Sequence, residues 1–323
     1  MMKGRQREIL HDYIDLKIMT DGAGQVYCVG ETVLDIIFRA DQPVAAKPGG
    51  SMLNSAVSLA RAGDAVNFIS MLPGDRVGQL ILRFLEENHV STHYLATLPS
   101  GKTILALAFL DEHRDAEYVF YKDTVPVGFE FSMPEIHKGD IILFGSFFSL
   151  TGDVRPALIP FIRSAKSKGA FIMYDPNFRK PHLPDLERFR PAIIENIGLA
   201  DLVRGSDEDF RLMFGTANAQ EAFEVVSRSG CPLLVYTKNK DGAELLTRSG
   251  HFCVIPEPIN PVSTIGAGDA FNAGIIHGLL RHPPEPADYD WPQVLQVALR
   301  FSEEVCMSLD NYISTSFGKS LRL

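Results

Sequence analysis

The sequence predicts an α/β fold in which helices cover both faces of a mostly parallel sheet. The chain has 323 residues, of which 46% are hydrophobic, so it can bury a sizeable core. Short apolar runs alternate with segments of helical spacing along most of the chain, and such alternation is typical of parallel sheets. The sequence contains no internal repeat or low-complexity tract, which favours one domain over two.

The N-terminal elements follow one another closely. VYCVG (26–30) is a short apolar run closed by glycine and predicts a strand, and the apolar stretch TVLDIIF (32–38) follows at once. SMLNSAVSLARAG (51–63) places Leu53, Val57 and Ala60 on one helical face and ends on a capping glycine. NFISML (67–72) predicts the next strand, and DRVGQLILRFLEENHV (75–90) predicts a helix.

The middle of the chain departs from this rhythm. TILALAFLD (103–111) and AEYVFYKD (116–123) flank the polar turn EHRD and predict an antiparallel hairpin, of the kind that forms a lid or a sheet edge. The alternation then resumes, with strands predicted at 140–147, 170–177, 200–206 and 231–238, helices at 155–169, 187–198, 219–230 and 292–309, and a hairpin-like stretch at 243–256.

Charge and cysteine usage narrow the class of protein. The net charge of −9 and the pI of about 5.5 argue against nucleic acid or an acidic membrane as a partner. The four cysteines are scattered, which is typical of reduced thiols in a cytoplasmic protein. No apolar run reaches the roughly 18–20 residues of a membrane span. Residues 1–24 mix charges throughout, unlike a secretory signal, and we interpret them as an N-terminal extension.

The segment PVSTIGAGDAFNAG (261–274) carries the clearest chemical signal. Gly266 and Gly268 stand where a helix begins, and a glycine-rich turn at a helix N-terminus offers unpaired N–H groups to an anion. Asp269 would repel a resting phosphate there, so its presence needs a reason. GAGD alone leaves two roles open, a helix cap or a general base that accepts a proton from an attacking hydroxyl. Neither a P-loop nor a dinucleotide fingerprint is present.

Distant segments make this signal specific. VGETVLDII, PGGSMLNSAVSLARAG, GDRVGQLI, DPNFR and STIGAGDAFNAG occur in this order. Their order and spacing resemble the ribokinase / phosphofructokinase-B family of carbohydrate kinases, and within it the bacterial fructokinase-like members. The resemblance covers nearly all of residues 25–315. It implies a ribokinase-like three-layer α/β/α sandwich, formed by a single kinase domain over 25–323 with β-lid segments at about 36–48 and 100–124.

The resemblance also implies the reaction and the residues that perform it. ATP would donate its γ-phosphoryl group to a hydroxyl of a ketohexose or of a related sugar acid, with Asp269 as the general base. Gly266, Ala267 and Gly268 would offer N–H groups to the transferred phosphoryl group. The matching sugar-binding positions are Asp35, Gly49, Gly50, Asn54 and Arg179, and the nucleotide-side positions are Asn177, Thr237, Asn239, Gly242 and Thr264. A carboxylate and an amide suit sugar hydroxyls.

Four positions depart from the family pattern. Where relatives carry Asn-x-x-Glu near magnesium, this chain has Ser206 and Asp209, so we expect Asp209 to act on Mg²⁺ only through water. Asn239 replaces a usual glycine, but asparagine tolerates left-handed backbone angles. Ser263 replaces an aspartate near a monovalent-cation site, which removes a negative charge there. We therefore hypothesise that potassium activation is weak or absent.

Several alternatives stay open. The substrate is open between a fructose-like ketohexose, 2-keto-3-deoxygluconate and a nucleoside, although no feature singles out a nucleobase pocket. Ser206 and Ser263 leave room for a catalytically silent sugar- or nucleotide-binding protein on the same fold, while the intact GAGD argues against it. The apolar run TILALAFL is compatible with a lid contact in a homodimer and equally with packing on its own domain.

Overall fold

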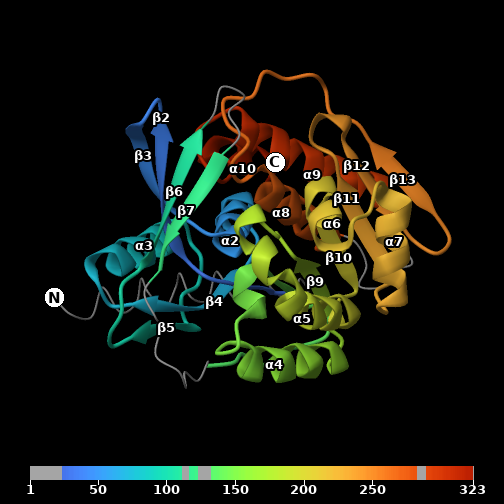
Figure 1. Cartoon of the computed structure of the whole chain (residues 1–323), viewed down its shortest axis with the longest axis horizontal. Coiled ribbons are helices and arrows are strands. Elements are labelled where there is room, and N and C mark those ends of the chain that lie inside the picture. The colour runs from blue at the N-terminus through green and yellow to red at the C-terminus, as the bar shows by residue number, and fades with distance from the viewer. Residues whose placement is uncertain (1–23, 111–115, 123–131, 282–288, 323) are drawn as a thin grey trace.

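A computed structural model describes residues 24–110, 116–122, 132–281 and 289–322 (Figure 1). Its main feature is a nine-stranded sheet. In spatial order the strands are β13 (His251–Val254), β12 (Ala243–Leu246), β11 (Leu233–Thr237), β10 (Leu202–Ser206), β9 (Phe171–Asp175), β8 (Ile141–Gly145), β1 (Val26–Val29), β4 (Val66–Pro73) and β5 (Leu95–Leu98). The strands from β11 to β5 pair in parallel, and β12 and β13 add an antiparallel edge.

Helices cover both faces of this sheet, as the alternation of elements predicts. One face packs against α2 (Ser51–Ala62), α3 (Arg76–Glu87), α8 (Ala267–Leu279), α9 (Trp291–Cys306) and α10 (Thr315–Ser320). The other packs against α4 (Arg155–Ser167), α5 (Leu186–Leu199), α6 (Asp207–Phe214) and α7 (Ala219–Arg228). Two apolar cores therefore lie on either side of the sheet, and the predicted three-layer α/β/α fold is confirmed.

A second, smaller sheet stands beside the large one (Figure 1). Its order is β3 (Gln42–Gly49), β2 (Val33–Arg39), β6 (Ile104–Leu110) and β7 (Ala116–Tyr121). The predicted hairpin is confirmed by the antiparallel pairing of β6 with β7, although its turn lies outside the described residues. Ile37 and Ala108 of this sheet form a small apolar cluster with Ile265, the residue before Gly266.

Some elements were not foreseen. The helix α6 begins directly after β10, inside the segment SDED. It has eight residues, the first three of which are acidic, so its apolar residues are too few to show a helical period. The short β5 and α10 were also missed. The proposed extension over residues 1–24 lies almost wholly outside the described residues. The division into one kinase domain with inserted lid segments stays a prediction.

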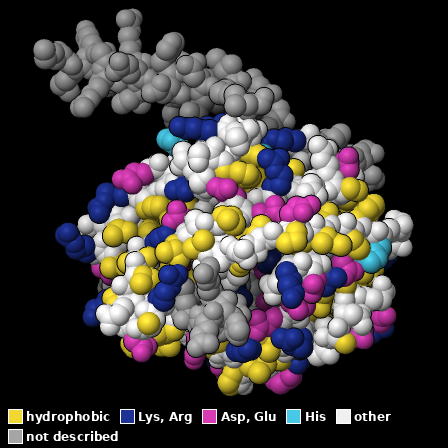
Figure 2. Space-filling view, turned by 90° about the horizontal axis from the view of Figure 1, so that it is seen from above, with side chains coloured by type: hydrophobic (Ala, Val, Ile, Leu, Met, Phe, Trp, Pro, Cys, Tyr) yellow, Lys and Arg dark blue, Asp and Glu magenta, His cyan; other side chains and the backbone are white. Residues whose placement is uncertain are grey.

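The surface agrees with the acidic composition. On the face shown in Figure 2, Lys and Arg side chains are interspersed with Asp and Glu rather than gathered into one basic area. Within the described ranges, none of the helices combines the length and the apolar character that crossing a bilayer requires.

Candidate active site

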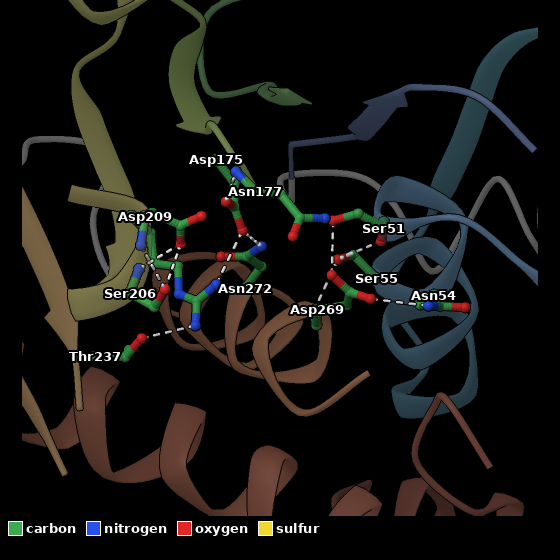
Figure 3. A network of polar contacts seen from close by, with 11 residues as sticks. Ser51, Asn54, Ser55, Asp175, Asn177, Ser206, Asp209, Thr237, Asp269 and Asn272 are labelled. Carbon is green, nitrogen blue, oxygen red and sulfur yellow. Dashed lines mark hydrogen bonds and ion pairs between the residues drawn. The ribbon is translucent and has the colours of Figure 1, made fainter. Parts of the chain in front are cut away.

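The candidate site lies where three neighbouring parallel strands end and α8 begins. β9 ends at Asp175, β10 at Ser206 and β11 at Thr237, so the three polar residues share one edge of the sheet. Ligands of open α/β sheets bind at this carboxyl edge. Figure 3 shows these side chains on one side of Asp269, and Ser51, Asn54 and Ser55 of α2 on the other.

The glycine turn presents the N-terminus of α8 to this edge. Gly266 has φ 80°, a left-handed conformation, and an added Cβ would lie 2.3 Å from the carbonyl oxygen of Asn311, so only glycine fits. The N–H of Ala267 donates to Thr264 O at 3.2 Å. The N–H groups of Gly268 and Asp269 donate to no acceptor among the described residues. Two donors at a helix N-terminus are therefore free for an anion.

Asp269 does not cap α8, which excludes one of the two roles left open by GAGD. The helix begins without a side-chain cap, and the Asp269 carboxylate instead accepts two hydrogen bonds from α2. Ser51 Oγ donates to Oδ1 at 2.6 Å and Asn54 Nδ2 donates to Oδ2 at 2.8 Å. Ser55 Oγ donates to the Asp269 carbonyl oxygen at 2.8 Å. The helix α2 thus fixes both the backbone and the carboxylate of Asp269.

The surroundings of Asp269 suit a proton acceptor near neutral pH. Burial raises the pKa of its carboxyl to about 6, against the opposing hydrogen bonds from Ser51 and Asn54. A base whose pKa lies near the working pH is efficient because it is ionised and still accepts a proton readily. Each carboxylate oxygen has lone pairs beyond the one that its donor uses, so a substrate hydroxyl can still bond to it.

This pKa predicts how the reaction rate depends on pH. If Asp269 is the general base, it acts only when ionised, so kcat/KM is expected to fall as the pH drops through about 6. Ser51→Ala removes a hydrogen-bond donor that lowers the pKa of Asp269. The fall in kcat/KM on the acid side should therefore begin at a higher pH in this variant. A pH–rate profile of both proteins measures this, with the exposed Ser167→Ala as control. An acid limb that is identical in all three proteins would contradict the assignment.

Asp35 brings a second buried carboxylate from the small sheet. It lies in β2, and Asn311 Nδ2 donates to its Oδ2 at 2.8 Å. Burial and the nearby charge of Asp269 raise its pKa to about 7, although Asn311 opposes the shift. An added Cβ on Gly49 would lie 2.0 Å from Asp35 Oδ2, so the carboxylate lies directly against the main chain. Asp35 and Asp269 therefore act on each other's charge across the site.

Arg179 and Tyr118 face these carboxylates from two different elements. The Arg179 side chain is exposed to solvent, although many protein atoms surround its guanidinium. Burial lowers its pKa, but Asp209, Tyr118, Asp269 and Asp175 outweigh this and raise it. Tyr118 comes from β7, and burial followed by the charge of Asp35 raises its pKa. The sequence analysis missed Tyr118, because an alternating strand does not indicate which tyrosine faces a site.

The nucleotide-side positions are only partly brought together. Thr237 Oγ1 accepts from Arg204 Nη2 at 2.8 Å, and Asn177 N donates to Asp175 Oδ1 at 2.8 Å. Asn239 has φ 47°, in the left-handed region expected there, and its carbonyl accepts from Gly242 N at 3.1 Å. Asn239 and Gly242 thus form a turn directly after β11, and the exposed Thr264 takes part through its carbonyl oxygen.

A buried arginine that the sequence analysis did not single out lies under the glycine turn. Arg204 is 8% exposed, and its Nη1 donates to Asp175 Oδ2 at 3.1 Å. An added Cβ on Gly268 would lie 2.8 Å from Arg204 Nη1, so the guanidinium packs against the turn itself. Asn272 Nδ2 also donates to Asp175 Oδ2. A charged residue within the buried strand LVRGS was the available signal.

Asp209, which the sequence analysis associated with Mg²⁺, lies in the first turn of α6. It forms a capping box with Ser206, in which Asp209 Oδ2 accepts from Ser206 N at 2.7 Å and Asp209 N donates to Ser206 Oγ at 3.1 Å. Its other oxygen, Oδ1, is buried and has no hydrogen-bond partner among the described residues. Such an oxygen fits a Mg²⁺ ion held through water, because Mg²⁺ prefers oxygen ligands and keeps several of its waters.

Several buried side-chain nitrogen and oxygen atoms of the region have no hydrogen-bond partner among the described residues. Those around the site are Asn54 Oδ1, Arg204 Nε, Asp209 Oδ1, Asn272 Oδ1 and Asn311 Oδ1. Each costs about 1–3 kcal/mol when left unsatisfied. A polar ligand that supplies partners here recovers some of that cost.

Free N–H donors beside a preorganised carboxylate, at the carboxyl edge of a parallel sheet, are typical of enzymes that transfer a phosphoryl group to a small molecule. The family model described as pfkB family carbohydrate kinase matches residues 23–312. The chain therefore belongs to the pfkB family of carbohydrate kinases, and it is an ATP-dependent sugar kinase.

Two curated relatives agree with this assignment. The chain is 30% identical to probable fructokinase-6, chloroplastic, of Arabidopsis thaliana, over 81% of this chain and 73% of the relative. It is 24% identical to a fructokinase of Vibrio alginolyticus, over 86% and 90% of the two chains.

Two solved structures share the fold at lower identity. A fructokinase double mutant of Vibrio cholerae, described with fructose, ADP and potassium ion, superposes with a TM-score of 0.84 at 22% identity, over 94% of this chain and 99% of that one. An aminoimidazole riboside kinase of Salmonella enterica, described with aminoimidazole riboside and an ATP analog, gives 0.80 at 21% identity, over 93% and 99%.

Proposed function

We propose that this kinase phosphorylates a hydroxyl of a ketohexose or a related sugar acid, with Asp269 as the general base. One observation carries the proposal. The Asp269 carboxylate is fixed by Ser51 and Asn54, and it follows directly on Gly268, whose N–H has no acceptor among the described residues. A carboxylate that can accept a proton thus lies next to an N–H group that can donate a hydrogen bond to a phosphate. An in-line transfer between a hydroxyl and a phosphate requires both groups.

The proposed step transfers the γ-phosphoryl group of ATP to the substrate hydroxyl. The substrate hydroxyl gives its proton to an Asp269 oxygen while its own oxygen forms a bond to the γ-phosphorus of ATP. The bond from that phosphorus to the bridging oxygen breaks, and ADP leaves with the electron pair. The N–H groups of Gly268 and Asp269 stabilise the charge on the transferred group, together with the positive end of α8. Ala267 joins them only if its bond to Thr264 O opens.

The sugar is proposed to lie between α2 and the small sheet. Asn54 donates from Nδ2 to Asp269, while its buried Oδ1 has no partner in the described part of the chain and can accept from a sugar hydroxyl. Asp35 lies against Gly49 and offers a carboxylate from the other side. Arg179 favours a substrate with a keto or carboxylate group near it. Fructokinases among the relatives make a ketohexose the first candidate.

Magnesium is proposed as the metal that accompanies ATP. When bound, it neutralises phosphate charge. Asp209 Oδ1 is the protein oxygen that would orient its water, since the other oxygen is engaged with Ser206.

A coupled ADP-release assay over a panel of sugars tests the function. The panel should contain fructose, 2-keto-3-deoxygluconate and nucleosides, because a riboside kinase shares the fold. We expect turnover with a ketohexose or a keto acid. Turnover with nucleosides alone would replace the substrate assignment, and binding without turnover on every sugar would favour a silent binding protein.

Ser263 predicts that the enzyme does not depend on potassium. The residue is 1% exposed, and its Oγ accepts from Ile265 N at 3.2 Å, so it contributes a turn bond rather than a negative charge. Rates in potassium and in tetramethylammonium are therefore expected to agree. Ser263→Asp restores the charge and should bring potassium stimulation with it. Strong potassium dependence of the unmodified enzyme would contradict this expectation.

The small sheet predicts a homodimer. β7 is an edge strand, and Val119, Phe120 and Tyr121 are 42%, 41% and 60% exposed along it. An edge strand with exposed apolar side chains pairs readily with another chain. We expect a solution mass about twice the chain mass of 35.7 kDa by light scattering. Phe120→Lys should shift it to that of one chain, and a single-chain mass in the unmodified protein would refute the dimer.

A further inference from the structure

The antiparallel edge of the large sheet carries three metal-binding side chains on one face. Glu244 of β12 is the cross-strand partner of Cys253 in β13. His251 lies two residues before Cys253, so strand geometry places both side chains on the same face. Glu244, His251 and Cys253 therefore converge on a hairpin that the phosphoryl-transfer site does not use.

Their atoms lie close to one another. His251 Nε2 is 2.7 Å from Glu244 Oε2 and 3.4 Å from Cys253 Sγ, and the three ligand atoms lie within 4.8 Å of one another. Around a tetrahedral zinc ion, ligand bonds of about 2.0–2.3 Å place N and O about 3.3 Å apart, and S and N about 3.6 Å apart. Small rotations of exposed side chains bridge these differences.

The second oxygen of Glu244 is also held. Lys238 Nζ donates to Oε1 at 2.5 Å, while Oε2 faces His251. Lys238 thus orients a ligand oxygen, as hydrogen-bond partners outside a metal's ligand set usually do.

We propose that Glu244, His251 and Cys253 bind a divalent transition metal ion of the zinc class, with water as the fourth ligand. A thiolate and an imidazole suit zinc, whereas magnesium and calcium require sets of oxygen atoms. Binding converts the Cys253 thiol to a thiolate and releases its proton to solvent. The ion crosslinks β12 to β13 at the outer edge of the sheet.

Cobalt(II) titration of the purified full-length protein tests the proposal, because cobalt occupies zinc sites and a Co–thiolate bond gives a charge-transfer band in the near ultraviolet. We expect this band to saturate at one ion per chain and to disappear when zinc is added. Cys253→Ser should abolish it, and His251→Ala should raise the Kd for zinc by about tenfold or more.

The matched control is Cys306→Ser, since Cys28 and Cys231 are buried and Cys306 is the other cysteine with solvent access. This variant should keep the band. Zinc should also raise the thermal midpoint of the unmodified protein and of the control, and leave that of Cys253→Ser unchanged. Absence of the band in the unmodified protein, or its persistence in Cys253→Ser, overturns the proposal. None of these readouts depends on kinase activity.

Discussion

Asp269→Asn is expected to lower kcat by about 10²–10⁴-fold, the usual contribution of a general base, while the affinity for ATP changes little. The fold should survive, because asparagine matches aspartate in shape. In the unmodified protein, Asn54 Nδ2 donates to the Asp269 carboxylate, and Asn54 Oδ1 has no partner among the described residues. A flip of the Asn54 amide lets it accept from the new side-chain N–H instead. The variant thus removes proton acceptance and keeps the packing.

Steady-state rates and ATP titration by calorimetry separate the two effects. Asp153→Asn makes the same change of an acid to its amide on an exposed turn, and it should leave both quantities unchanged. If Asp269→Asn retains full turnover, the proton leaves by another route and the base assignment is wrong. If it also loses ATP binding, Asp269 has a structural role that the present contacts do not account for.

Arg204→Met is expected to lower the free energy of unfolding by about 3–5 kcal/mol, the usual cost of breaking a buried ion pair. Asp175 is fully buried, and Arg204 is its cationic partner at 3.1 Å. Burial raises the pKa of Asp175 and Arg204 opposes that shift, so loss of the guanidinium leaves the buried carboxyl group without the cation that is hydrogen-bonded to it. Thr237 loses a hydrogen-bond donor at the same time.

Urea unfolding of three further variants isolates the cause. Arg228→Met breaks the pair with Glu224, whose side chains are 78% and 50% exposed, and it should cost less than about 0.5 kcal/mol. Adding Asp175→Asn to Arg204→Met removes the uncompensated charge and should recover part of the loss, whereas Asp175→Asn alone gives the reference for additivity. A loss in Arg204→Met as small as in Arg228→Met would show that the pair contributes little.

The fold was largely predictable because its signals are local. The strand VYCVG and the helix SMLNSAVSLARAG each carry their own period and a terminating glycine, and both appear where expected. The helix α6 escaped because its first three residues, Asp207, Glu208 and Asp209, are charged and follow a strand without a break. The short strand β5 forms because it pairs with β4, and its own four residues do not specify a strand.

The candidate site was predictable only where its residues lie in motifs. GAGD, GGSMLN and DPNFR indicated Asp269, Asn54 and the edge at Asp175, and the assigned roles stay predictions. The partner of Asp35 gave no signal, because Asn311 lies 276 residues away in sequence and makes contact only after folding. Ser51 stood inside a quoted motif, yet the sequence could not show that its hydroxyl would point at Asp269.

The contact between Ile265 and the small sheet has an energetic consequence. Ile265 packs against Ile37, which shares a face of β2 with Asp35, and it immediately precedes Gly266. If the sugar binds at Asp35 and the phosphate binds at the glycine turn, as proposed, the two ligands adjoin opposite sides of one apolar contact. Linkage is reciprocal, so whatever factor the sugar adds to nucleotide affinity, the nucleotide must add to sugar affinity. If this coupling is favourable, the two substrates bind cooperatively, and each of them binds more weakly when the other is absent.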